Sequence, residues 1–159
     1  MTEIVDHTVT HSTFVLEHTY PVSPERVFAA WASKQAKTPW FVALPEGASV
    51  VEPLDLDFRV GGKERLAVSM ADGVEIVYEG CYQDIVSDRR IVATTQMYLN
   101  RKPMSVTVAT IELTPIEDGT RLVLTEQGAY LDGLDEPKYR EAGTRDQLAS
   151  LARYLKKSS

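Results

Sequence analysis

The sequence is poor in the residues that mark several common protein classes. It has one cysteine, Cys81, so an intramolecular disulfide is excluded. Its longest charge-free stretches, such as Ile91–Asn100, are about half of the roughly 20 apolar residues that a membrane-spanning helix needs. The first residues do not show a basic region followed by an apolar core, so we expect no secretory signal and a cytoplasmic location.

The chain also lacks an excess of positive charge. Its 17 Lys and Arg residues are outnumbered by 23 Asp and Glu residues, and the basic residues are scattered. A nucleic-acid-binding surface needs clustered basic groups, so we predict no nucleic-acid partner. The three histidines include His7 and His11, but neither Cys nor a carboxylate cluster accompanies them, and we predict no metal. Phosphate-loop and nucleophile-elbow motifs are missing, and we predict no cofactor.

What the sequence does contain is a series of alternating apolar and polar segments, typical of β-strands. Short turns separate most of them, and the Asp72-Gly73 pair is a strong hairpin signal. Loops this short predict antiparallel neighbours. We expect one domain over residues 12–157, preceded by a polar tail at 1–11 without regular structure. The predicted strands cover residues 12–19, 49–60, 63–70, 74–85, 89–99, 104–113 and 120–127.

Helices are predicted in two places. Ser23-Pro24-Glu25 is a typical helix start, with a capping serine and proline in the first turn. A second short helix at 33–37 should end near Thr38, because Pro39 disfavours α conformation in the residue before it. Near the C-terminus, four apolar residues at helical spacing predict a long amphipathic helix starting at about residue 138, namely Leu148, Leu151, Ala152 and Leu155.

These elements together predict an α+β fold in which a curved antiparallel sheet of six or seven strands wraps around the C-terminal helix. The adjacent glycines Gly61 and Gly62 give the chain the freedom to turn between the second and third predicted strands. The helix presents a modest apolar stripe to a large sheet face. A cavity between sheet and helix is therefore expected, and such a cavity is the general form of a small-molecule site.

The order and spacing of several short motifs resemble the SRPBCC superfamily, whose helix-grip fold includes START domains and the major birch pollen allergen. Within it, the chain is most similar to the family named after the activator of the heat-shock-protein-90 ATPase. The resemblance covers residues 13–156, and it implies the helix-grip fold. The matching segments are Glu17–Tyr20, Ser23–Trp31, Trp40-Phe41, Asp57–Gly62, Asp72-Gly73, Gly80–Ile85, Leu113–Pro115 and Asp118–Leu122.

The chain departs from this family at the last helix, where relatives often carry a Gly-Trp pair. Here Gly143 is followed by Thr144. A bulky ring is therefore missing near one end of the expected cavity. Two outcomes remain open: the cavity is larger than in relatives, or Tyr139 or Tyr130 fills the space.

Two groups of side chains are candidates for ligand contacts. Glu126 shares a strand face with Leu122 and Leu124, so it either enters the cavity or, if the strand ends at Thr125, lies at a solvated rim. Tyr78 and Tyr82 are core aromatics whose hydroxyls can orient a ligand. The full predicted ligand-binding set is Trp31, Trp40, Phe41, Phe58, Tyr78, Tyr82, Glu126 and Leu148.

Three functions are compatible with these features. The first is binding of a small, mainly hydrophobic molecule in the cavity. The second, implied by the resemblance, is a co-chaperone-like module that stimulates a chaperone ATPase. The third is an enzyme similar to polyketide cyclases and aromatases, for which Glu126 paired with Tyr78 or Tyr82 is the proposed acid–base pair. No catalytic residue is assigned, no membrane partner is predicted, and the expected state is a monomer or weak homodimer.

Overall fold

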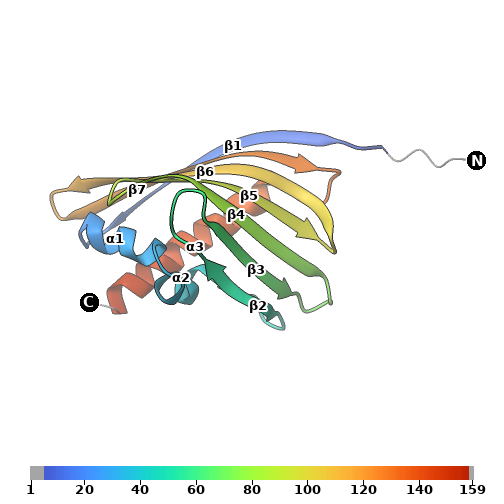
Figure 1. Cartoon of the computed structure of the whole chain (residues 1–159), viewed down its shortest axis with the longest axis horizontal. Coiled ribbons are helices and arrows are strands. Elements are labelled where there is room, and N and C mark those ends of the chain that lie inside the picture. The colour runs from blue at the N-terminus through green and yellow to red at the C-terminus, as the bar shows by residue number, and fades with distance from the viewer. Residues whose placement is uncertain (1–5, 158–159) are drawn as a thin grey trace, which may run out of the picture.

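A curved antiparallel sheet covers one side of three helices. The computed structural model describes residues 6–157 of the 159-residue chain (Figure 1). In chain order, the elements of this part are β1 (Val9–Tyr20), α1 (Pro24–Trp31), α2 (Lys34–Phe41), β2 (Ser49–Leu56), β3 (Lys63–Ser69), β4 (Glu75–Val86), β5 (Arg90–Leu99), β6 (Lys102–Ile116), β7 (Gly119–Leu131) and α3 (Pro137–Lys157). The predicted α+β helix-grip fold is confirmed.

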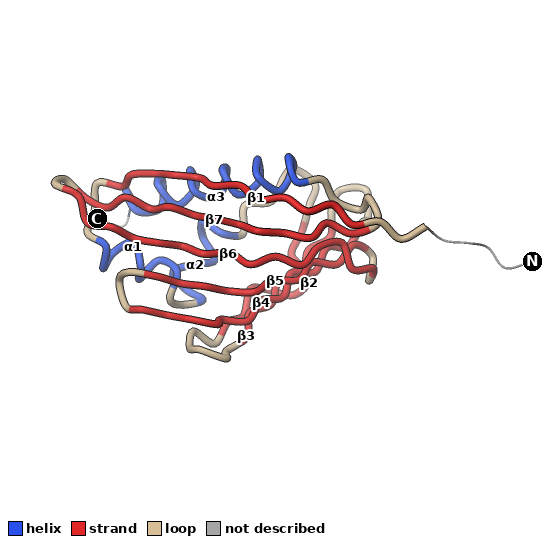
Figure 2. The backbone as a smooth tube through the Cα atoms, turned by 90° about the horizontal axis from the view of Figure 1, so that it is seen from above, coloured by secondary structure: helices blue, strands red, loops and turns tan. Residues whose placement is uncertain are grey.

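Within residues 6–157, seven strands form one sheet in the order β1-β7-β6-β5-β4-β3-β2. Five of the six strand pairings join strands that follow one another in the chain, and the sixth pairs β1 with β7. Figures 1 and 2 show that the three helices lie on the same face of the sheet, which arches over them. This face therefore carries the core and anything enclosed with it.

Strands β1 and β7, which pair at one edge of the sheet, are longer than predicted. β1 begins at Val9, which pairs with Leu131, so residues 9–11 belong to the sheet rather than to a tail. The predicted tail at residues 1–5 lies outside the described residues. β7 continues past Gln127 to Leu131, because Ala129 and Tyr130 pair with β6 on one side and β1 on the other. Polar residues such as Thr10 and Gln127 weaken the hydrophobic alternation, and only strand pairing extends the ladder across them.

Helix α2 is also longer than predicted, since it runs through Pro39 to Phe41. Ser33 caps its start by accepting a hydrogen bond from the Ala36 amide. Pro39 is exposed to solvent, whereas the next residue, Trp40, is completely buried and donates a hydrogen bond to the Ala30 carbonyl. Burial of this ring offsets the backbone hydrogen bond that proline cannot donate. Tertiary packing therefore overrides the local signal that predicted an end near Thr38.

The predicted turn at the two glycines is confirmed. Gly61 has a φ of +84°, a conformation that favours glycine. A Cβ on Gly62 would lie 1.9 Å from the Asp57 carbonyl oxygen, so a side chain is sterically excluded there. The amide of Gly61 donates to the Tyr82 carbonyl, and the amide of Tyr82 donates to the Gly62 carbonyl. This turn therefore fixes the start of β3 against β4.

Helix α3 packs on the sheet through the predicted leucines. Leu148, Leu151 and Leu155 are all at most 2% exposed. The Tyr20 hydroxyl donates a hydrogen bond to the Leu148 carbonyl, which ties the helix to β1. The main contacts of α3 are with β1, α1 and α2. The core is therefore densest toward α1 and the C-terminal half of α3, and it opens toward β3, β4 and β5.

Candidate functional site

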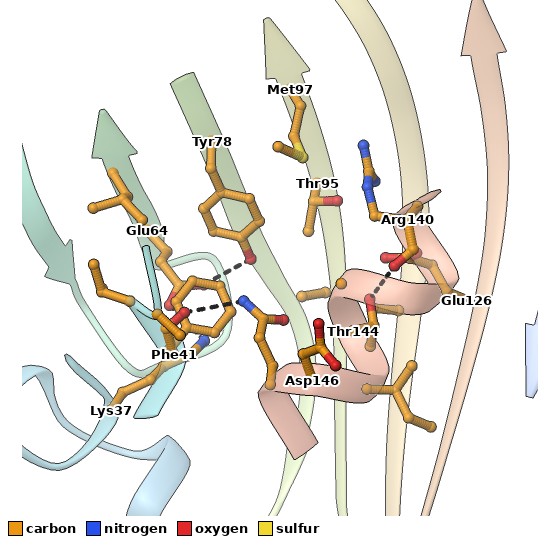
Figure 3. A pocket seen from close by; sticks show the side chains of 18 of the residues that line it. Lys37, Phe41, Glu64, Tyr78, Thr95, Met97, Glu126, Arg140, Thr144 and Asp146 are labelled. Atoms are coloured by element: carbon orange, nitrogen blue, oxygen red, sulfur yellow. Dashed lines mark hydrogen bonds and ion pairs between the residues drawn. The ribbon is translucent and has the colours of Figure 1, made fainter. Parts of the chain in front are cut away.

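A cavity of about 430 Å³ lies between the sheet and helices α2 and α3. This volume is within the usual range for small-molecule sites. Its wall is mainly apolar and comes from α2, from the inner face of β3 to β7 and from α3 (Figure 3). Leu66, Val68, Ile76, Ile91, Met97, Met104 and Leu124 are among the aliphatic residues that line it.

A buried ion pair forms one polar group on this wall. The Lys37 ammonium on α2 lies 2.5 Å from a carboxylate oxygen of Glu64 on β3, and the two side chains are 4% and 1% exposed. The Tyr78 hydroxyl donates a 3.1 Å hydrogen bond to the second oxygen of Glu64. The Lys37 ammonium also lies 4.4 Å from the centre of the Phe41 ring. Glu64 is therefore held by two partners, and the positive charge of Lys37 is compensated.

Two further polar side chains lie near this pair. The Trp31 indole nitrogen is buried without a hydrogen-bond partner in the described part of the chain, and the Trp31 ring centre lies 5.4 Å from the Lys37 ammonium. Burial, followed by the negative charge of Glu64 and hydrogen bonding to it, raises the pKa of Tyr82 above its usual range, so its hydroxyl stays protonated. Neither polar atom is exposed to the cavity.

Glu126 on β7 belongs to a second polar group, and the predicted rim position is wrong. The strand continues beyond it, and Glu126 is only 7% exposed. One carboxyl oxygen accepts a 3.4 Å hydrogen bond from Thr107, which is itself hydrogen-bonded to Thr95, whereas the other oxygen has no partner in the described part of the chain. Burial raises the pKa of Glu126, although Arg140 and the Thr107 hydrogen bond act in the opposite direction. The carboxyl group is therefore biased toward its neutral form.

Arg140 on α3 lies beside this carboxyl group but already has two partners. One guanidinium nitrogen lies 2.7 Å from both the Asp135 carboxylate and the Ser105 hydroxyl. Both members of the Arg140–Asp135 pair are 12% exposed. The guanidinium also lies 5.5 Å from the centre of the Tyr130 ring, which packs behind it. In Figure 3, Arg140 and Glu126 lie on the side of the cavity opposite Lys37 and Glu64.

The structure brings most of the predicted ligand-binding residues together on this wall. Seven of the eight line the cavity, namely Trp31, Trp40, Phe41, Tyr78, Tyr82, Glu126 and Leu148. Phe58 does not; it packs edge-on against Phe28 and Tyr82 behind the wall. The proposed acid–base pairing of Glu126 with a tyrosine is not formed, because Tyr78 donates to Glu64 and Glu126 is bonded to Thr107.

Lys37, Glu64 and Arg140 were missed by the sequence analysis. Glu64 alternates in phase with Leu66 and Val68, which is the same signal that singled out Glu126. Lys37 lies three residues before Trp40 and therefore on the same side of the short helix. These patterns place each residue on a buried face, but they do not identify its partner.

The cavity is open near Gly143. Nothing lies within 4 Å of a Cβ built on Gly143, and both Gly143 and Thr144 line the space. Tyr139 reaches the wall but is 64% exposed, and Tyr130 is buried outside the lining. Neither tyrosine closes this end of the cavity, whereas a cavity larger than in relatives stays a prediction.

The described part of the chain shows neither a metal-binding cluster nor a membrane-spanning helix. Residues 6–157 contain no cluster of His, Cys, Asp and Glu that could hold a metal ion. In the same range, no helix has the length and apolar character needed to cross a bilayer.

A helix-grip fold with an apolar cavity under its sheet defines a protein of the SRPBCC class. The chain belongs to the family of activator of Hsp90 ATPase homolog 1-like proteins, whose sequence model matches residues 21–156. This match confirms the resemblance seen in the sequence motifs.

Solved structures of similar proteins show the same fold. The protein Mll3558 from Rhizobium loti is 48% identical, with a TM-score of 0.83 over 92% of this chain and 99% of that one. A protein from Rhizobium leguminosarum is 34% identical, with a TM-score of 0.90 over 96% and 99%. An AHSA1-like protein from Aeromonas hydrophila is 16% identical, with a TM-score of 0.67 over 92% and 94%, and this similarity concerns the fold alone. A search of curated proteins finds no match.

Proposed function

We propose that the protein binds a small, mainly apolar molecule in the cavity between the sheet and α3. The observation that carries this proposal is the cavity of about 430 Å³, which is lined mainly by aliphatic and aromatic side chains. Binding of an apolar ligand in such a cavity is favourable, because it removes the apolar surface of the ligand and of the cavity wall from water. Trp31, Trp40, Phe41, Tyr78, Tyr82, Glu126 and Leu148 are its proposed contact residues.

The test is a ligand screen read out by thermal stability and native mass spectrometry. A ligand held at 100 times its Kd stabilises the folded state by about 2.7 kcal/mol, which is easily detected. Gly143→Trp places a ring in the open end of the cavity, where nothing lies within 4 Å of the new Cβ. It should abolish or strongly weaken binding while the fold persists.

Ala142→Trp is the matched control for that variant. Ala142 is the preceding residue of α3, is exposed, and does not line the cavity. Binding should therefore survive this substitution. Equal loss of binding in both variants, or a screen of apolar compounds without a single stabilising ligand, would refute the proposal.

The family name supports a second candidate function, stimulation of a chaperone ATPase through the domain surface. It is tested by measuring the ATPase rate of an Hsp90-type chaperone with and without the protein. The Gly143→Trp variant separates the two functions, because a change inside the cavity should leave a surface interaction intact. An unchanged ATPase rate at saturating protein would remove this candidate.

A further inference from the structure

The charged residues on the cavity wall are largely neutralised by one another. The wall carries two cationic groups, Lys37 and Arg140, and each forms an ion pair with a carboxylate that also lines the cavity. The partners are Glu64, 2.5 Å from Lys37, and Asp135, 2.7 Å from Arg140. A cation that is already paired offers little to an anionic ligand, because the ligand would have to compete with a fixed, hydrogen-bonded carboxylate.

The remaining carboxyl groups make the space still less favourable for an anion. Glu126 is buried on the wall, and Asp146 on α3 lines the cavity at an exposed position. A ligand carboxylate would therefore meet four carboxyl groups and two cations that are both occupied. Like charges brought together at a desolvated site cost several kcal/mol.

We propose that the cavity selects uncharged apolar molecules, such as ketones and alcohols, and discriminates against carboxylates of the same size. The Lys37–Glu64 pair acts as a charge filter: it occupies the cation that would otherwise bind an acidic head group. The hydrocarbon part of the ligand lies against Leu66, Ile91 and Leu124. This inference rests on the proposed function and specifies its ligand class.

The test compares three decyl probes that differ in their head group: 2-decanone, 1-decanol and decanoate. Each is titrated into the full-length protein at neutral pH by isothermal calorimetry, below its micelle-forming concentration. The ketone and the alcohol should each bind at least about tenfold more tightly than decanoate. If decanoate binds as tightly as the ketone, the charge-filter proposal is overturned, while ligand binding itself stands. Absence of binding by any apolar compound would overturn both proposals.

Substitution of the ion pair reverses the predicted preference. Glu64→Gln leaves Lys37 as an uncompensated cation, so decanoate should become the tightest of the three probes. The double variant Lys37→Met with Glu64→Gln removes both charges and should restore the preference for 2-decanone. If Glu64→Gln does not fold, the wild type and the double variant still decide the matter, because both must favour the ketone. An unchanged order of probes in a folded Glu64→Gln variant contradicts the filter role.

Discussion

The two polar groups of the cavity differ in how completely their buried charges are compensated. Lys37 and Glu64 are almost completely inaccessible and form a close pair, which Tyr78 supports. Arg140 and Asp135 keep some contact with solvent, and Glu126 beside them retains an oxygen without a partner in the described residues. The first group is a fixed structural unit, whereas the second keeps a group that can change its protonation. A carboxylate in a complete ion pair keeps its charge, whereas an incompletely paired carboxyl group can change its protonation with pH or on ligand binding.

The sharpest test of this contrast removes one cation from each group. Lys37→Met leaves Glu64 buried and without its counter-ion, which should lower the free energy of unfolding by about 3–5 kcal/mol. Arg140→Met should cost less, because water reaches the Arg140–Asp135 pair, whose side chains are 12% exposed, and can solvate the remaining carboxylate. Urea denaturation at neutral pH measures both values. Equal losses would show that the Lys37–Glu64 pair is no more important to the fold than the outer one.

A smaller effect is expected for the two tyrosines. Tyr78→Phe removes a hydrogen bond to a charged carboxylate and should cost about 1.5–3 kcal/mol. Tyr82→Phe removes a hydroxyl that interacts less closely with the same carboxylate, so the loss of stability should be smaller. The same denaturation experiment compares them. A larger loss for Tyr82→Phe than for Tyr78→Phe would contradict the assigned hydrogen bonds.

The smallest effect is a pH-dependent one at Glu126. Because burial raises the pKa of this group in the folded state, wild-type stability is favoured below the unfolded-state pKa and is lost as the pH rises through the folded-state pKa. Glu126→Gln does not titrate. The variant should therefore be more stable than the wild type at pH 8, by about 1 kcal/mol, and this advantage should shrink toward pH 4.5.

The melting temperature of Glu126→Gln and wild type, measured across this pH range, checks the prediction. Glu17→Gln is a suitable control, because Glu17 is exposed on β1. It should leave the pH profile of the wild type unchanged. A Glu126→Gln profile parallel to that of the wild type would mean that Glu126 does not titrate differently on folding.

Local sequence patterns predicted the fold well because each pattern has a direct physical cause. Ser23 and Ser33 cap helices through their own side chains, and Leu148, Leu151 and Leu155 mark the buried face of α3. Element boundaries were wrong where long-range packing overrode local preference. Trp40 holds α2 helical beyond Pro39, and pairing with β1 and β6 extends β7 past Gln127.

The candidate site was predictable only in part. The alternation around Leu122 and Leu124 placed Glu126 on the inner face, and the aromatic residues of the wall were recognised as a group. The Lys37–Glu64 pair was not found, because its members lie 27 positions apart on elements of different type. Phe58 is aromatic like many residues of the wall, but its position behind Tyr82 depends on how the turn between β2 and β3 contacts β4.

By itself, the sequence determined where the chain turns, which faces are apolar and in what order helices and strands follow, since these depend on neighbouring residues. Only the tertiary structure decided which buried charges neutralise each other, which donors are left without partners, and how much space remains under the sheet. Those properties depend on distances between side chains that are far apart in the chain, and folding sets such distances through the curvature of the sheet and the position of α3.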